Sequence, residues 1–281
     1  MKIFILVICG LVTCLGGGVA RAYALVNVSP VFYVALGDSR AAAPTWTSVL
    51  AGDHCGRTAN AYPVLVAKAL RVSYRSVACT GATSDDVLRG QKILGARPLR
   101  PQVDALSVHT GLVTVSIGGN DIDWSRLILP CFPLFGDGHC RTNHTMEAAI
   151  TTALRAFTLK LDHLLAEIAL RAPVARVVVV GHGGYFGSRG CLPDAPMSDL
   201  DAPTVAAFFD RFNQVLRVGA ARRGASYVDV AGPAAGHDTC AGARRWFLGD
   251  WPRGDIQTRH PTPLGSANIA RLIVGVVRHG R

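Results

Sequence analysis

Five short apolar segments, each followed by a turn of small or polar residues, constrain the fold of this 281-residue chain more than any other feature. They span residues 31–36, 74–79, 112–117, 177–180 and 227–230. Helical patterns separate them, at residues 62–70, from 85 onward, and at 146–170, 204–222 and 264–278. Buried strands that alternate with helices are typical of a parallel sheet covered on both faces. We therefore predict an α/β fold with a five-stranded parallel sheet in three layers, α/β/α.

The first 22 residues have the layout of a secretory signal peptide. Lys2 precedes an apolar run from Ile3 to Leu15, and a glycine patch leads to Ala20-Arg21-Ala22. A basic tip, a short apolar run and a small-x-small site predict export with cleavage near Ala22. The alternatives are an uncleaved anchor or a lipoprotein, but the run is shorter than the roughly 20 residues of a membrane span. Cleavage leaves residues 23–281 as one domain, secreted or held in the cell wall.

The cysteines agree with export. Two of the eight lie in the predicted signal peptide, and an even set of six remains. Such a set in an exported chain predicts three disulfides, although the sequence alone does not choose the pairing. The simplest pairing joins nearest neighbours, Cys55–Cys79, Cys131–Cys140 and Cys191–Cys240. A zinc site is the competing interpretation, but no Cys-x-x-Cys pair is present, and we expect no metal.

The charge balance indicates which partners the chain attracts. The formal net charge of +10 falls to +8 once Lys2 and Arg21 leave with the signal peptide. A basic protein is attracted to anionic membranes or cell-wall polymers. Its basic residues are scattered and accompany no aromatic stacking motif, so we expect no nucleic-acid partner. We expect a monomer.

Three polar turns follow the first three predicted strands. They are Gly37-Asp38-Ser39, Thr80-Gly81 and Gly118-Gly119-Asn120-Asp121. Sites in open parallel sheets form outside the carboxyl ends of the strands, so these turns should meet there. His260 lies in a turn before the last predicted helix and could reach the same edge.

Together these residues supply what acyl transfer needs. A serine hydroxyl is a weak nucleophile without a neighbouring base, and His260 is the candidate base for Ser39. The oxyanion of a tetrahedral intermediate needs hydrogen-bond donors. The candidates are the backbone N–H groups of Ser39 and Gly81 and the side-chain amide of Asn120. This chemistry needs no metal and no organic cofactor.

Each motif alone also fits a plain turn, and we expect Asp38 and Asp121 to stabilise turns rather than to react. The glycine-rich segment 181–187 does not have Gly-x-Gly-x-x-Gly spacing, so we interpret it as a loop. No Gly-x-Ser-x-Gly elbow is present, which argues against the α/β-hydrolase fold.

The ordered set Gly37-Asp38-Ser39, Gly81, Gly118-Gly119-Asn120-Asp121 and His260-Pro261 resembles the four blocks of the SGNH/GDSL hydrolase family. With six cysteines, the chain is most similar to secreted actinobacterial esterases and lipases of that family. The resemblance implies a flavodoxin-like three-layer fold, with the serine, glycine, asparagine and histidine in the roles given above. It also implies three sequential disulfides.

Departures from the family pattern concern the histidine and the serine. Members often carry an acid in Asp-x-x-His, where this chain has Gln257, with Asp255 two residues upstream. Either Asp255 reaches His260, or a backbone carbonyl near residues 257–258 orients the imidazole. We favour the second arrangement, a Ser–His dyad. Arg40 follows the serine where tyrosine is common, and Thr262 replaces an asparagine.

The sequence thus predicts a secreted carboxylic ester hydrolase, an esterase or lipase acting on ester or lipid substrates. One alternative is a carbohydrate O-deacetylase of the same fold. The other is a non-catalytic, basic cell-surface binding protein on a decayed hydrolase fold.

Overall fold

The computed structural model describes residues 33–93, 96–133 and 136–280. The signal peptide predicted for residues 1–22 lies outside these ranges. None of the helices in the described ranges is long and apolar enough to cross a membrane.

Within the described residues, five parallel strands form one sheet in the order β2-β1-β3-β4-β5. They are β1 (Tyr33–Gly37), β2 (Tyr74–Ser76), β3 (Leu112–Ser116), β4 (Arg176–Val180) and β5 (Ser226–Val228). Since β2 and β3 lie on opposite sides of β1, the chain reverses its direction of winding at β1. The predicted parallel sheet is confirmed, and this reversal is where open α/β sheets place their sites.

Strand β2 is shorter than the segment 74–79 predicted for it. The chain nevertheless keeps its course beside β1, because Val77 N–H donates to Ala35 O and Cys79 N–H donates to Gly37 O, both at 3.0 Å. The turn that follows Cys79 is therefore held next to the end of β1.

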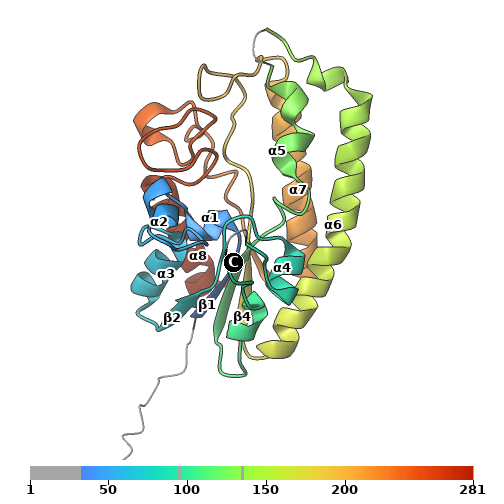
Figure 1. Ribbon diagram of the computed structural model, residues 1–281. Coiled ribbons are helices and arrows are strands. Elements are labelled where there is room, and N and C mark those ends of the chain that lie inside the picture. The colour runs from blue at the N-terminus through green and yellow to red at the C-terminus, as the bar shows by residue number, and fades with distance from the viewer. Residues whose placement is uncertain (1–32, 94–95, 134–135, 281) are drawn as a thin grey trace, which may run out of the picture.

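Helices cover both faces of the sheet (Figure 1). On one side α3 packs against α8, and on the other α6 packs against both α4 and α7. The α-helices of the described ranges are α1 (Ser39–Ala42), α2 (Trp46–Leu50), α3 (Tyr62–Leu70), α4 (Ser84–Arg89), α5 (Trp124–Leu127), α6 (His144–Arg171), α7 (Ala202–Arg222) and α8 (Pro263–His279). Short 3₁₀ turns are η1 (Gln102–Ala105), η2 (Leu129–Cys131), η3 (Cys140–Thr142) and η4 (Gly242–Arg244).

Local sequence explains where the main helices begin. Thr83 and Asp86 form a capping box at α4, and the Asn143 side chain accepts from Met146 N–H at the start of α6. Thr262 caps α8, with Pro263 as its first residue. Strands β1 and β3 are completely buried between the helical layers, so they form the centre of the core.

The described cysteines form three disulfides, Cys55–Cys79, Cys131–Cys140 and Cys191–Cys240. These are the nearest-neighbour pairs. Each lies in a connection that follows the carboxyl end of a strand, so the disulfides brace the loops that surround this edge of the sheet.

Candidate active site

The turn after β1 places Ser39, which is half-buried, at the first position of α1. Gly37 has φ +138°, and a side chain at that position would meet Ser116 O at 2.2 Å, so only glycine fits. The Gln102 side chain holds Gly37 twice, accepting from its N–H at 2.8 Å and donating to its carbonyl at 2.9 Å. Asp38 caps α1 by accepting from Arg40 N–H at 2.9 Å. Ser39 therefore begins a helix whose preceding turn is fixed by the Gln102 side chain and by the Asp38 cap.

Asp38 is buried beside the serine, and burial is the largest influence that raises the pKa of its carboxyl group to about 7. The Arg40 backbone bond and the Arg40 charge oppose that rise. The cap position matches the turn-stabilising role expected from the sequence.

The turn after β2 presents Gly81 with φ +77° and an exposed backbone. Its neighbour Thr80 is held on both sides: Thr80 N–H donates to Cys55 O at 3.1 Å, and Gln91 Nε2 donates to Thr80 O at 2.8 Å. Gly81 N–H and Ser39 N–H donate no hydrogen bond to any part of the chain that the structure describes. Both N–H groups are therefore available as hydrogen-bond donors.

The turn after β3 joins the turn after β2. Asn120 Nδ2 donates to Ala82 O at 2.9 Å, and since a side-chain amide carries two N–H groups, one remains for a substrate. Asp121 accepts from the backbone and the hydroxyl of Ser84 at the start of α4. Burial raises the pKa of Asp121, opposed by these bonds. Asp121 thus ties two turns together, while Asn120 is exposed.

His260 is half-buried in the loop before α8. Its Nδ1 lies 2.7 Å from Thr258 O, and a carbonyl can only accept, so Nδ1 carries the proton and Nε2 keeps its lone pair. Burial is the main cause that lowers the pKa of His260 to about 4; the Thr258 carbonyl acts against it, and the Arg40 charge adds to it.

The segment before His260 is fastened to the segment that follows α1. Gln257 N–H donates to Pro44 O at 3.3 Å, and Trp46 N–H donates to Asp255 O at 2.8 Å. The Asp255 carboxylate is exposed and accepts from Thr47 N–H at 2.8 Å, at the start of α2. The partner of His260 Nδ1 is thus a carbonyl and not Asp255; the Gln257 backbone also faces the imidazole.

These backbone bonds bring the Ser39 and His260 segments side by side. Ser39 Oγ and His260 Nε2 make no hydrogen bond to each other or to any other described residue. Catalytic hydrogen bonds often form only when substrate is bound. The arrangement therefore offers a hydroxyl, an imidazole with a free lone pair, and three unused N–H donors, which is the equipment of acyl transfer.

Residues 35–267 match the GDSL-like Lipase/Acylhydrolase family. The chain belongs to this family. Lipase 1 of Streptomyces coelicolor is 32% identical to it over 255 residues, 89% of this chain and 88% of that protein. The family relationship establishes the chain as a carboxylic ester hydrolase.

Two solved structures are similar to this chain over most of its length. Phospholipase A1 of Streptomyces albidoflavus is 30% identical with a TM-score of 0.66, and the match covers 86% of this chain and 96% of that one. The extracellular lipase of Streptomyces rimosus is 28% identical with a TM-score of 0.67, covering 86% and 97%.

An aromatic wall that the sequence did not reveal lies beside the Asn120 turn of this GDSL hydrolase. Trp124 stacks on Tyr185 with ring centroids 5.2 Å apart, and Phe132 packs on Phe186 at 4.9 Å. The guanidinium of Arg259, next to His260, lies 5.3 Å from the Trp124 ring. These contacts join residues distant in the chain, so no local motif could announce them.

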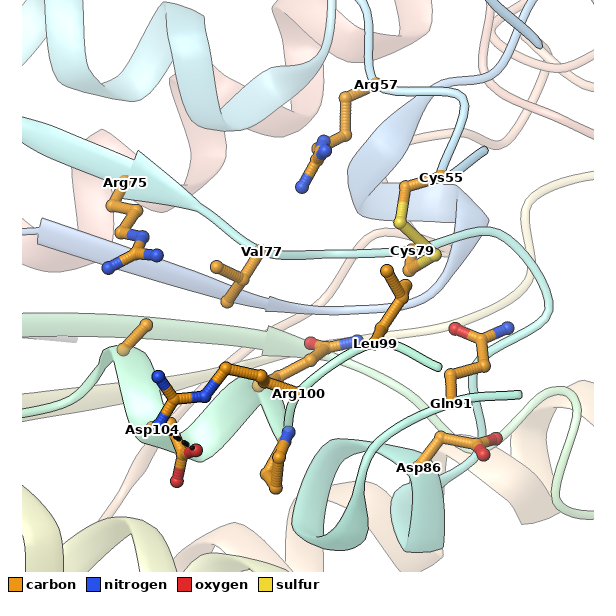
Figure 2. A pocket seen from close by; sticks show the side chains of 13 residues that line it. Cys55, Arg57, Arg75, Val77, Cys79, Asp86, Gln91, Leu99, Arg100 and Asp104 are labelled. Carbon is orange, nitrogen blue, oxygen red and sulfur yellow. Dashed lines mark hydrogen bonds and ion pairs between the residues drawn. A yellow bond between two sulfur atoms is a disulfide. The ribbon is translucent and has the colours of Figure 1, made fainter. Parts of the chain in front are cut away.

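A cavity of about 310 Å³ adjoins the first two turns (Figure 2). Gln91 and Gln102, which hold those turns, form part of its wall. Its arginines are largely paired, Arg100 with Asp104 at 3.1 Å and Arg57 with Asp53 at 3.0 Å. Neither Ser39 nor His260 lines it, so this cavity is separate from the reacting groups.

Proposed function

We propose that this hydrolase cleaves lipid-like carboxylic esters through an acyl-enzyme on Ser39, with His260 as general base. The observation that carries the proposal is the bond between His260 Nδ1 and the Thr258 carbonyl, because it leaves Nε2 as the acceptor of a proton. A backbone carbonyl here takes the orienting role that an aspartate has in a triad, so the pair is a Ser–His dyad.

The reaction divides into two acyl transfers. His260 Nε2 takes the Ser39 proton as Oγ attacks the ester carbonyl carbon, and the oxyanion is bound by the N–H groups of Ser39 and Gly81 and by Asn120 Nδ2. The protonated imidazole then donates to the leaving alcohol, which leaves an acyl-serine. Water, deprotonated by His260, attacks this ester, and the acid is released with Ser39 restored.

The surroundings of the site favour lipid esters over sugar acetates. The aromatic wall (Trp124, Tyr185, Phe132 and Phe186) begins at the Asn120 turn, where a Cβ at Gly119 would be 3.1 Å from Trp124 Cδ1. Trp124 and Phe132 are partly exposed and offer apolar surface to an acyl chain, whereas an O-acetyl sugar needs polar partners. Relatives of similar length are named lipase and phospholipase A1.

We also propose that the enzyme works outside the cell, as a monomer with one catalytic domain at residues 23–281. The signal-like residues 1–22, three disulfides and an extracellular relative support export. A net charge of +8 after cleavage favours adsorption to anionic lipid or cell-wall surfaces.

Hydrolysis of p-nitrophenyl acetate, butyrate and decanoate by the oxidised protein tests the proposal. We expect kcat/KM to rise from acetate to the longer chains, and Ser39→Ala to lose activity on all three. Preference for acetate would favour the deacetylase instead. A folded wild-type protein without turnover, whose serine also resists a fluorophosphonate, would overturn the proposed function.

A further inference from the structure

Arg40 follows Ser39 in α1, yet its side chain is 3% exposed. The guanidinium reaches the segment after β4, more than 140 residues away. Nη1 donates to Tyr185 Oη at 2.6 Å and to Gly183 O at 3.3 Å, and Nη2 donates to Gly181 O at 3.1 Å. One side chain thus anchors the nucleophile helix to the opposite half of the sheet edge.

The same guanidinium lies between two aromatic rings. Its Cζ is 5.1 Å from the centroid of Tyr185 and 5.0 Å from that of Phe247. Phe247 pairs with Pro261, and the next residue, Leu248, donates its N–H to His260 O at 3.0 Å. Arg40 therefore contacts the strand-like segment that supports the histidine loop, so a continuous set of contacts connects the residue after Ser39 with the backbone of His260.

No carboxylate forms an ion pair with Arg40 among the described residues, and its Nε is buried without a partner. The buried Asp38 carboxyl group feels the Arg40 charge but forms no ion pair with it, so the groups that contact the guanidinium are carbonyls and rings and not an acid. Burying such a charge is unfavourable, so its place in the residue that follows Ser39 calls for a functional explanation.

We propose that Arg40 is a positioning residue of the Ser39–His260 pair: its planar guanidinium fixes the nucleophile helix against the histidine loop. The proposal rests on the Ser–His mechanism above. It assigns a role in this chain to a position where the family commonly has tyrosine.

The Arg40 charge adds support through its effect on the titratable groups around it. They are Asp38 from its own turn, Tyr62 from α3, His182 and Tyr185 from the β4 side, Tyr227 from β5 and His260 from the loop before α8. After burial, the Arg40 charge is the main influence that lowers the pKa of His260. Removing the charge should raise that pKa, so a larger fraction of His260 would be protonated and inactive in mild acid.

Substitution of Arg40 by methionine or by lysine separates the positioning by the guanidinium from the effect of its charge. Arg40→Met removes the charge and the donors but keeps an apolar stem of similar length. Arg40→Lys keeps the charge but cannot supply a planar fork to two carbonyls and a phenol. Arg155→Met, on the exposed face of α6, is a matched control for loss of one positive charge.

The experiment measures kcat, KM and the pH profile of kcat/KM for p-nitrophenyl butyrate. For Arg40→Met we expect kcat to fall about 100-fold with little change in KM, as for displaced catalytic groups. The acid limb should move up by about one pH unit. Arg40→Lys should keep the wild-type acid limb but lose kcat, and Arg155→Met should match the wild type.

Folded Arg40→Met with wild-type kcat and an unmoved acid limb would overturn the proposal. If Arg40→Met does not fold, Arg40→Lys and Tyr185→Phe decide, since Tyr185→Phe removes only the hydroxyl that accepts from Nη1. Wild-type kcat in both variants would equally overturn it. An inactive wild-type enzyme would instead contradict the Ser–His mechanism, so the two failures are distinguishable.

Discussion

His260 and His182 both lie at the carboxyl edge of the sheet and both have lowered pKa values, yet their hydrogen bonds give them opposite protonation patterns. Nδ1 of His260 faces the Thr258 carbonyl at 2.7 Å and must donate, so Nε2 can accept a proton. Nδ1 of His182 accepts from Gly183 N–H at 3.0 Å, so its proton sits on Nε2. One neighbouring backbone group thus decides which imidazole can act as a base at Nε2.

The surroundings of the two histidines also differ, because His182 is more deeply buried than His260. His182 is 2% exposed, stacks on Phe209 at 5.9 Å, and exchanges two backbone hydrogen bonds with the Asn213 side chain. Burial, followed by the charges of Arg40 and His260, holds the pKa of His182 well below its usual value. His260 is only half-buried, in a loop. The comparison supports the proposal that His260 transfers protons, whereas His182 has a structural environment.

The largest expected effect separates the two histidines by activity. His260→Ala should lower kcat for p-nitrophenyl butyrate about 10⁴-fold or more, because it removes the base. His182→Gln, which keeps a donor and an acceptor, should stay within about tenfold of the wild type. Steady-state kinetics on both folded variants checks this. Equal losses in the two variants would break the comparison.

The second prediction concerns stability. Asn213→Ala leaves the buried N–H and carbonyl of His182 without partners, so the free energy of unfolding should fall by about 2–4 kcal/mol. Asn268→Ala in α8, where the amide of a half-buried side chain bonds at the surface, is the matched control and should change it by less than about 0.5 kcal/mol. Urea denaturation measures both. An Asn213→Ala protein as stable as the control would refute a structural role for this cluster.

The third prediction is the acid limb of kcat/KM. Because the folded-state pKa of His260 is about 4, the base is neutral above that pH, and activity should fall tenfold per pH unit only below it. His182→Gln should leave this limb in place. A wild-type limb near the ordinary histidine value would contradict the burial argument. Asp38→Asn is the control for a contribution to the same limb from the Asp38 carboxyl group, whose pKa is about 7.

The smallest expected effect concerns Asp255. Its carboxylate accepts from Thr47 N–H at the start of α2, so Asp255→Asn should leave kcat within about threefold of the wild type. Loss of a true triad aspartate lowers kcat about 10⁴-fold. Kinetics of the variant at pH 7 therefore tests the dyad. A loss of 100-fold or more would return Asp255 to the mechanism.

The sheet was predictable from the sequence because its signals are local. Apolar runs that end in Gly37-Asp38-Ser39, Thr80-Gly81 and Gly118-Gly119-Asn120-Asp121 identify three strands and the edge at which they end. The limits of single elements were less accurate, as β2 illustrates, since an edge strand has only one neighbour to define it.

The parts of the site that could not be predicted depend on contacts between distant residues. Arg40 was visible only as a departure from the family pattern, and its carbonyl partners lie on another strand connection. The bond from His260 to Thr258 is local, but it depends on the path of a loop that is anchored to Pro44. The histidine of the glycine-rich segment, His182, was interpreted as part of a plain loop, because nothing in its neighbours indicates that Asn213 and Phe209 will enclose it.

Labelling with a fluorophosphonate, followed by mass spectrometry of the peptides, tests most directly whether His260 activates Ser39. The account predicts one phosphonyl group per wild-type chain, located on Ser39, no label on Ser39→Ala, and labelling of His260→Ala slower by about 10³-fold or more. His182→Gln should label at close to the wild-type rate. A label on another residue, or unchanged labelling of His260→Ala, would contradict the account.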